Sequence, residues 1–190
     1  MKRLFDFLLS SFGIFFLGPL GILFALLVKR EDGGAVLYTQ ERWGRGGRKF
    51  KVYKFRTMLQ GTDQKGGLAP AKEDDARITR IGKLLRVTAM DELPQLINIW
   101  KGDMSFVGPR ALAVDELDPS SPNFSERHRV RPGLTGSAQI YAPRDLPLMG
   151  KFRYDLEYIK TRTFWYDLKL LFLSLWISLR GKWESRGKKI

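Results

Sequence analysis

The stretch TAMDELPQLINIWKGDMSFVGPR, residues 88–110, places two adjacent carboxylates, Asp91 and Glu92, ahead of an apolar run. Apolar side chains then recur at the spacing of one helix face, at Leu93, Leu96, Ile97 and Trp100. Because proline is tolerated only in the first turn, Pro94 predicts a helix that begins at about Asp91 and Glu92 and ends at Gly102. Both carboxylates then lie at the positive end of the helix dipole, which favours their ionised forms.

This position allows two interpretations of the acid pair. In the first, Asp91 is the N-cap of the helix and Glu92 is a first-turn acid. In the second, the two form a reaction centre. Arg86 precedes the pair, residues 108–110 (GPR) follow its helix, and residues 126–136 (ERHRVRPGLTG) combine arginines with glycines. The paired N–H groups of arginine and the exposed amides of glycine turns both donate hydrogen bonds to phosphate oxygens. This neighbourhood therefore favours the second interpretation.

The composition predicts an anionic partner. The chain of 190 residues has 33 Lys and Arg against 20 Asp and Glu, a formal net charge of +13. Nucleic acid, an anionic lipid surface and a phosphorylated substrate all fit this charge. The absence of cysteine excludes disulfides, thiolate nucleophiles and zinc–cysteine sites. Adjacent acids among arginines indicate metal-assisted phosphoryl chemistry, with Mg²⁺ because the ligands are oxygens; the single histidine, His128, is more typical of a structural role.

Residues 7–28 predict a membrane helix, because they carry no charge and at about 1.5 Å per residue they reach the ~30 Å of a hydrocarbon core. Gly18 and Pro19 lie at the midpoint, where proline predicts a bend. Basic residues flank both ends, at Lys2, Arg3, Lys29 and Arg30. The positive-inside tendency favours both ends on the cytoplasmic side, so a re-entrant helix is expected; a kinked single span and a cleaved signal peptide are the alternatives.

The rest of the chain predicts an α+β fold, a mostly helical small domain with a short β-hairpin. Residues 35–40 and 49–55 flank the turn-rich RWGRGGR and predict the hairpin. Residues 78–87 predict a basic amphipathic helix. Residues 61–75 and 115–123 predict surface loops.

The C-terminal region predicts a second contact with lipid. Residues 164–179 are rich in Leu, Phe and Trp, but a helix of about 24 Å is short for a span. The aromatic residues and the basic tail that follows are typical of an interfacial amphipathic helix on an anionic leaflet; a core helix with a solvated tail is the alternative. We therefore divide the chain into a re-entrant membrane helix (residues 1–30) and a cytoplasmic domain (residues 31–190).

Five motifs, in order along the chain, resemble those of the bacterial monotopic phosphoglycosyl transferases: KFRTM (54–58), RIGKLLRVTAMDELPQL (80–96), KGDMSFVGPR (101–110), RHRVRPGLTGSAQI (127–140) and YDLEYI (154–159). The match runs from the N-terminal segment to about Lys169. The resemblance implies transfer of a phospho-sugar from a UDP-sugar to a polyprenyl phosphate such as undecaprenyl phosphate, with release of UMP. It places this first membrane step of glycoconjugate assembly at the cytoplasmic face of the bacterial inner membrane.

The resemblance also implies roles for residues. Asp91 would be the nucleophile that forms a covalent aspartyl phospho-sugar, Glu92 would assist the acceptor, and the two would hold the Mg²⁺ that the family requires. Substrate-binding roles are implied for Lys54, Arg56, Arg86, Arg110, Arg131, Gly133 and Asp155. The bend is Gly18-Pro19 where the family commonly has Ser-Pro.

Two other functions remain open on the residues alone. A basic membrane-tethered module would bind nucleic acid or anionic lipid without catalysis, in a salt-sensitive way. Most aromatic residues lie in apolar runs rather than between basic residues, which argues against nucleic acid as a partner. A membrane-attached nucleotide-sugar hydrolase would release UMP without any polyprenyl phosphate. A homodimer is an assembly that the sequence leaves open.

Overall fold

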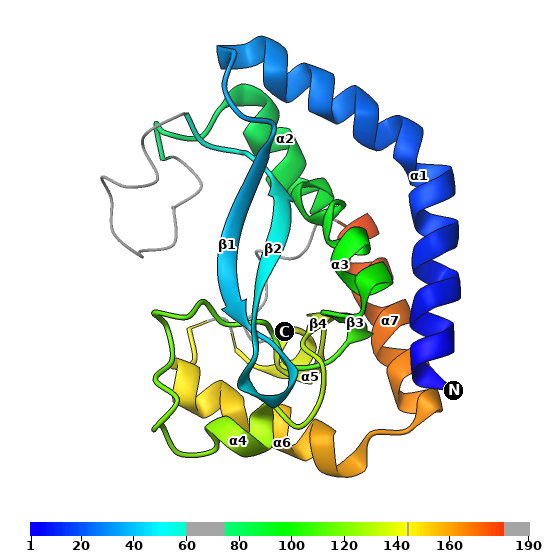
Figure 1. Cartoon of the computed structure of the whole chain (residues 1–190), viewed down its shortest axis with the longest axis vertical. Helices are drawn as coiled ribbons and strands as arrows, with labels where there is room; N and C mark the ends of the chain where they lie inside the picture. Colours follow the sequence, from blue (N-terminus) through cyan, green and yellow to red (C-terminus); the bar gives the residue numbers. More distant parts are fainter. Residues whose placement is uncertain (60–74, 144, 181–190) are drawn as a thin grey trace.

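The computed structural model describes residues 1–59, 75–143 and 145–180, which form an α+β fold with two small sheets (Figure 1). The elements are α1 (Lys2–Asp32), β1 (Leu37–Trp43), η1 (Arg45–Gly47), β2 (Lys49–Phe55), α2 (Arg80–Val87), η2 (Met90–Glu92), α3 (Gln95–Lys101), β3 (Ser105–Val107), α4 (Phe124–Arg127), β4 (Gly133–Thr135), α5 (Ser137–Tyr141), α6 (Leu148–Thr161) and α7 (Phe164–Leu179). The predicted α+β class is confirmed. Most of the loop predicted at residues 61–75 and the basic tail beyond Arg180 lie outside the described residues.

The N-terminal helix α1 is continuous but changes direction near its middle (Figure 1). Pro19 lies inside it, and Gly33 ends it in the left-handed conformation, with its N–H 3.0 Å from the oxygen of Lys29. Within the described ranges, α1 is the one helix that is long and apolar enough to cross a membrane. Its outward side is exposed and apolar, at Leu8, Phe12, Phe15, Phe16, Ile22, Leu23 and Leu26.

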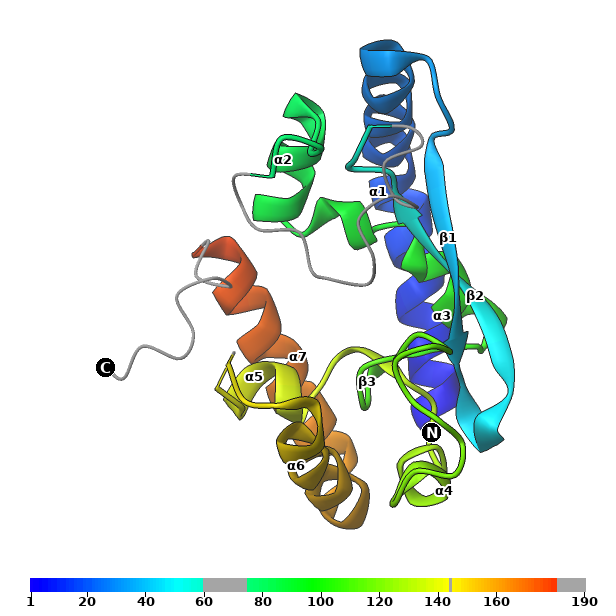
Figure 2. The same ribbon diagram turned by 90° about the vertical axis from the view of Figure 1, so that its left-hand side faces the viewer.

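Strands β1 and β2 pair in antiparallel register from Leu37 opposite Phe55 to Trp43 opposite Lys49. The predicted hairpin is therefore present, but its first strand ends at Trp43 rather than at Gln40, because pairing continues into the segment predicted as a turn. Helix α3 contacts both α1 and β2 of this hairpin, and α2 contacts α1 near its C-terminal end (Figure 1). Figure 2 shows α5, α6 and α7 on the opposite side of the molecule from the hairpin and α1.

Asn98 of α3 fastens this helix to β2 from a fully buried position. Its Nδ2 donates to the oxygen of Lys51 (2.8 Å), and its Oδ1 accepts from the amide of Tyr53 (3.0 Å). Around it lies the main core, formed by Val52, Leu96, Ile99, Met104, Phe106, Val107, Tyr158 and Leu170. The core thereby fixes α3 against the strand that ends near Lys54.

Two predicted helices differ in detail from the sequence expectation. The helix expected over residues 78–87 begins at Arg80, because the hydroxyl of Thr79 caps it by accepting from the amide of Gly82 (2.9 Å). The C-terminal helix α7 has the predicted bounds. It buries Leu170 and also Asp167, while Trp165 and Trp176 remain exposed. One side of α7 is thus a core element.

Strands β3 and β4 lie parallel and unusually close, because glycines line their contact. Gly108 and Gly133 approach so closely that a Cβ on either would overlap the other's backbone, and a Cβ on Gly136 would overlap the oxygen of Gly108. The Gly133 amide donates to the oxygen of Pro109 (2.9 Å). This close contact between the two strands holds the segment that carries Arg110 beside Gly133.

Candidate active site

The two carboxylates lie in the single 3₁₀ turn η2, which precedes α3. Ala89 adopts the left-handed conformation (φ 57°) and turns the chain out of α2, and the Leu93 amide then donates to the oxygen of Met90 (3.1 Å). The α-helix begins only at Gln95, with Pro94 as its N-cap. The prediction of Asp91 as the N-cap of this helix is therefore wrong, although proline does lie at the helix start as expected.

Lys54 at the end of β2 joins the two acids. Its ammonium forms a close ion pair with Glu92 and lies 3.9 Å from Oδ2 of Asp91. The three side chains are only partly exposed, by 20 % for Lys54, 16 % for Asp91 and 26 % for Glu92. Because Asn98 holds α3 against β2, the lysine and the acid pair are fixed relative to one another.

The two neighbouring acids have pKa values shifted in opposite directions. Burial raises the pKa of Asp91 to about 6; the Glu92 carboxylate adds to the rise, and Lys54 and Arg86 oppose it. Burial acts in the same direction on Glu92, but Lys54 and then Arg110 outweigh it and hold the pKa of Glu92 below its ordinary value. The dipole argument predicted that the position favours the ionised form of both acids. For Asp91 burial shifts the pKa in the opposite direction, although at about 6 the carboxyl is still mostly ionised at neutral pH.

A pocket beside Glu92 collects residues from distant parts of the chain. It is lined by Arg42, Val52, Lys54, Glu92, Gln95, Met104, Arg110, Ala111, Gly133, Leu134 and Gln139. Lys54, Arg110 and Gly133, which the resemblance singled out, are thus brought together with Glu92. Arg86 reaches the same neighbourhood from α2, where its Nε donates to Oγ1 of Thr57 (2.9 Å).

Arg42 is a pocket residue that the sequence did not identify. Its guanidinium donates to the oxygen of Ala111 and to Oε1 of Gln40 (2.8 Å). Burial lowers the pKa of Arg42, and the neighbouring Arg110 lowers it further. The available signal was weak, because Arg42 heads the RWGRGGR segment that was interpreted as a turn.

The other three predicted substrate-binding residues lie elsewhere. Arg56 pairs with Asp32 at the end of α1, and Nε of Arg131 donates to the oxygen of Gly102 (2.7 Å). Asp155 accepts from Nε of Arg127 (2.9 Å) in a pair that is almost fully buried. Their roles in substrate binding stay predictions.

Asp155 nevertheless has an indirect connection to the pocket. Nη2 of Arg127 donates to the oxygen of Arg110 (2.5 Å), so the buried pair holds the backbone of a pocket residue. Arg127 is a second residue that the sequence did not single out for a role of its own.

The donor set of the acid pair fits Mg²⁺ with few protein ligands. In the described ranges, no group of three or more histidine, aspartate or glutamate side chains could hold a metal ion together. Asp91 and Glu92 therefore offer two carboxylates, and phosphate oxygens and water would supply the remaining positions. This is the usual arrangement for Mg²⁺ bound with a phosphorylated substrate.

Comparison with known proteins identifies the family. The family model described as bacterial sugar transferase matches residues 1–181. The chain is 40% identical over 187 residues to a UDP-N-acetylgalactosamine-undecaprenyl-phosphate N-acetylgalactosaminephosphotransferase of Aeromonas hydrophila, which covers 95% of this chain and 44% of the relative. It is 39% identical to exopolysaccharide production protein PSS of Rhizobium leguminosarum bv. phaseoli (96% of this chain, 97% of the relative). It is also 39% identical to the uncharacterized sugar transferase EpsL of Bacillus subtilis (92% and 85%).

The chain thus spans less than half the length of the Aeromonas relative but nearly the whole of the Rhizobium relative. The range of the family match, residues 1–181, includes the acid pair, the arginine-bearing segments and the N-terminal helix. The resemblance to bacterial phosphoglycosyl transferases is confirmed, and the chain belongs to the bacterial sugar transferase family.

Proposed function

We propose that this protein transfers a sugar 1-phosphate from a UDP-sugar to undecaprenyl phosphate and releases UMP. The observation that carries the proposal is the buried Asp91, whose pKa of about 6 leaves it mostly ionised at neutral pH beside Glu92 and Lys54. The name of the Aeromonas relative supports the two substrate classes. Transfer of a phospho-sugar to a lipid phosphate is the first membrane step in assembling a glycoconjugate.

In the first step, a carboxylate oxygen of Asp91 attacks the β-phosphorus of the UDP-sugar. A new P–O bond forms to Asp91, and the bond from that phosphorus to the bridging oxygen breaks, so UMP leaves with the bridging oxygen. Burial strips water from the Asp91 carboxylate and raises its basicity, which makes it a better nucleophile than an exposed aspartate.

In the second step, a phosphate oxygen of undecaprenyl phosphate attacks the same phosphorus. The acyl phosphate bond breaks, and the Asp91 carboxylate is regenerated while a lipid diphosphate sugar forms. Glu92, held ionised by Lys54 and Arg110, lies next to this centre and orients the incoming phosphate through shared cations.

The cationic residues of the pocket bind and neutralise the diphosphate. Lys54, Arg42 and Arg110 line it with Glu92, and Arg86 approaches Asp91 from α2. Mg²⁺ held by Asp91 and Glu92 would supply further charge neutralisation for the phosphates. Gly133 lets the chain pass close to the bound phosphates, since it lines the same pocket without a side chain.

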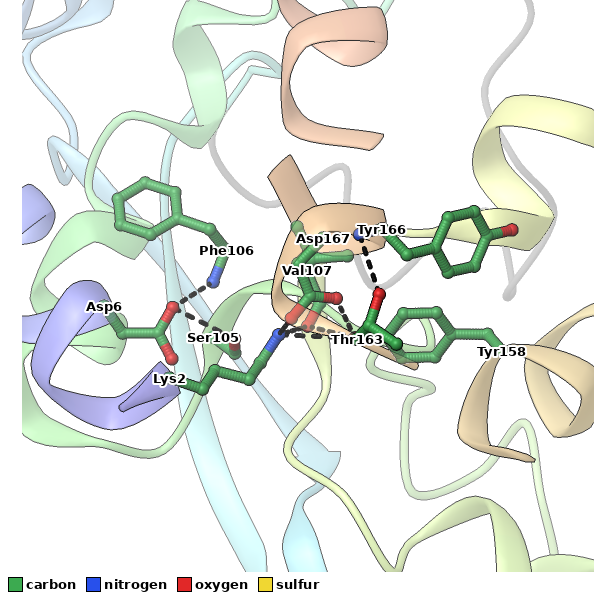
Figure 3. Close-up of polar contacts among 9 residues, drawn as sticks. All are labelled: Lys2, Asp6, Ser105, Phe106, Val107, Tyr158, Thr163, Tyr166 and Asp167. Atoms are coloured by element: carbon green, nitrogen blue, oxygen red, sulfur yellow. Dashed lines mark hydrogen bonds and ion pairs between the residues drawn. The ribbon is translucent and has the colours of Figure 1, made fainter. Parts of the chain in front are cut away.

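The proposed site of action is the cytoplasmic face of the inner membrane, with α1 inserted as a re-entrant helix. Both ends of α1 are held by the same domain, which supports this topology. At the start, Lys2 donates to the oxygen of Val107 (2.9 Å) and pairs with Asp167 (Figure 3). At the end, Glu31 accepts from the amide of Arg80 (2.6 Å).

The exposed aromatic side of α7 would rest on the same anionic leaflet. Trp165 and Trp176 are 75% and 54% exposed, which suits side chains that lie at a lipid interface. With α1 inserted and α7 on the surface, the acceptor's phosphate would lie at the level of the catalytic domain.

The direct test is the release of UMP by full-length protein in detergent, with a panel of UDP-sugars and undecaprenyl phosphate. Asp91→Asn is expected to abolish release, and the matched control Asp115→Asn, at an exposed acid outside the pocket, is expected to retain it. Turnover by Asp91→Asn at the wild-type rate would exclude the nucleophile role.

The intermediate has its own test. Wild-type protein incubated with the reactive UDP-sugar alone should gain the mass of one phospho-sugar and release one equivalent of UMP. Asp91→Asn should gain none. Repeated UMP release without undecaprenyl phosphate would instead identify a hydrolase.

A further inference from the structure

A second, strongly cationic cleft lies away from the acid pair. It is bounded by the start of α1, the segment before β4 and the junction of α6 with α7, and it has a volume of about 470 Å³. Its lining includes Arg45, Val107, Arg129, Arg131, Arg162 and Phe164. None of its lining residues lines the pocket beside Glu92, so the two are separate sites.

The cleft has a large excess of positive charge. Six of its lining side chains are cationic, namely Lys2, Arg3, Arg45, Arg129, Arg131 and Arg162, and two are carboxylates, Asp6 and Asp167. Both carboxylates have partners at the edge of the cleft, and Asp167 neutralises Lys2, so a net positive charge remains on the arginines (Figure 3). Asp6 accepts from Oγ of Ser105 (3.1 Å) and the amide of Phe106 (3.2 Å), and Asp167 pairs with Lys2 and accepts from Tyr158 (2.6 Å).

The arginines themselves lack carboxylate partners. In the part of the chain that the structure describes, Arg45, Arg129 and Arg162 form no salt bridge, and all three are exposed. Arg3 donates only to the backbone oxygens of Ile99 (2.6 Å) and Trp100 (2.5 Å). Such a group of unneutralised guanidinium groups favours an oxyanion ligand.

Like charges are also crowded together here. The pKa of Arg131 lies below its ordinary value because the guanidinium is partly buried and because Arg3 and Arg45 lie nearby. Charges of one sign held this close are stabilised when an anion binds between them. Phosphate groups, with several strong acceptor oxygens, match the planar donor forks of arginine.

Apolar surface next to the cleft indicates where the phosphate comes from. Phe164 lines the cleft and is 42% exposed, and the adjoining Trp165 is 75% exposed. Phe164 packs against Phe5 of α1, and the same part of α1 exposes Leu4, Phe7 and Leu8. A cationic cleft beside exposed apolar surface suits a ligand with an anionic head and apolar tails.

We propose that this cleft binds the phosphate of an anionic phospholipid headgroup, and so anchors the domain at the point where α1 enters the leaflet. The proposal rests on the membrane attachment proposed above. It does not require the transferase activity, because the cleft and the acid pair share no residue. Free phosphate and nucleotides carry the same chemistry without the tails, and the experiment separates these sources.

The test uses full-length protein in a non-ionic detergent and follows the melting temperature as dioctanoyl phosphatidylglycerol is added. Parallel titrations use inorganic phosphate, UMP and dioctanoylglycerol, which has the tails but no phosphate. Phosphatidylglycerol is expected to raise the melting temperature of the wild type with saturation. Inorganic phosphate and dioctanoylglycerol are expected to have no effect at the same concentrations. UMP is the product of the proposed reaction, so any stabilisation that it causes at the catalytic pocket is expected to be the same in the wild type and in a variant without Arg45, Arg129 and Arg162.

Two triple variants locate the effect. Arg45→Gln/Arg129→Gln/Arg162→Gln is expected to weaken the apparent affinity for phosphatidylglycerol more than tenfold, since each basic residue near an anionic surface contributes about fivefold. Lys51→Gln/Arg153→Gln/Lys160→Gln removes the same charge from exposed positions outside the cleft and is expected to bind as the wild type does. Replacing the three cleft arginines by lysine, which keeps the charge, is expected to retain most of the affinity.

Equal affinities in the two glutamine variants would overturn the proposal. Saturable stabilisation by inorganic phosphate, or by UMP in a way that depends on the three cleft arginines, would overturn the lipid as the source of the phosphate. UMP release from UDP-sugar is measured on the same preparations. If the wild type releases UMP but does not bind the lipid, this inference alone is refuted, and if the wild type binds the lipid but does not release UMP, the transferase proposal alone is refuted.

Discussion

At the scale of single residues, the chemistry depends on one aspartate that is buried next to a lysine. Asp91 and Glu92 are neighbours in sequence, yet only Glu92 forms a close pair with Lys54, and Asp91 lies 3.9 Å from the same ammonium. Burial therefore decides the pKa of Asp91, and the cations decide that of Glu92. The pair thus combines a carboxylate of raised pKa with a neighbour whose pKa is lowered.

The pKa of Asp91 predicts the pH dependence of the first step. Only the ionised carboxylate attacks, so the UMP burst in rapid-quench experiments should fall about tenfold per pH unit below about 6 and level off above about 7. Lys54→Gln removes a charge that lowers this pKa, so the inflection should move to higher pH. Lys51→Gln, on the same strand and exposed, should leave it in place. An inflection near pH 4 would contradict the burial of Asp91.

The same pKa predicts a change in stability. Folding raises the pKa of Asp91 from 3.8 to about 6, so the folded state binds the proton more tightly and loses stability as the pH rises through this range. Asp91→Asn removes this loss of stability, which amounts to ~3 kcal/mol in the free energy of unfolding at neutral pH if nothing else changes. The melting temperature of Asp91→Asn should exceed that of the wild type at neutral pH, and the gain should vanish near pH 4. An equal difference at both values would contradict this account.

At the scale of elements, two sets of contacts position the acid pair. One joins α3 to β2, and the other is the close contact between β3 and β4 at Gly108 and Gly133. Asn98 is the buried side chain that hydrogen-bonds α3 to β2. Asn98→Ala leaves the buried oxygen of Lys51 and the amide of Tyr53 without their partner, so the free energy of unfolding should fall by about 2–4 kcal/mol. Lys101→Gln, at the end of the same helix, loses only an exposed contact with the Tyr53 ring and should change it by less than about 1 kcal/mol. Thermal or denaturant unfolding in detergent measures both.

The close contact between β3 and β4 gives a second prediction at this scale. Gly133→Ala places a methyl group inside the backbone of Gly108 and Thr135, so folding should fail or the melting temperature should fall steeply. Gly18→Ala is the matched control, because nothing lies within 4 Å of a Cβ there and the residue is helical. Its stability should be unchanged or higher by up to about 1 kcal/mol. Equal melting temperatures of the two variants would show that the backbones of Gly108 and Gly133 can move apart to accept a methyl group.

At the scale of the whole molecule, both ends of α1 contact the same domain. Lys2 and Arg3 bind β3, α7 and the end of α3, while Glu31 and Asp32 bind the start of α2 and the end of β2. A helix held in this way has both ends on one side of the bilayer if it enters lipid at all. The polar contacts at the two ends are therefore as important to the proposed topology as the bend.

Topology can be tested with thiol labelling because the chain has no cysteine. A cysteine tag at Met1 and the substitution Ser120→Cys, at an exposed position of the domain, should both react with an impermeant maleimide only after the inner membrane is opened. Labelling of the Met1 tag in intact spheroplasts would contradict the re-entrant helix and favour a kinked span.

The sequence by itself determined the features that depend on local stereochemistry and periodicity. Alternation and turn residues predicted the hairpin, apolar spacing predicted the bounds of α7, and Pro94 predicted a helix start close to the acids. These signals act over a few residues, so they survive without knowledge of the fold. The ordered motifs also predicted the family, which the matches confirm.

Only the tertiary structure decided what lies beside the acid pair and how strongly each acid is protonated. Arg42 reaches the pocket through strand pairing and the contact with Ala111, and Asp155 is held away from it by Arg127. The helix dipole suggested an ionised Asp91, but the structure replaces that helix start by a 3₁₀ turn and buries the carboxylate. Burial and charge proximity arise between residues far apart in the chain, and no local pattern encodes them.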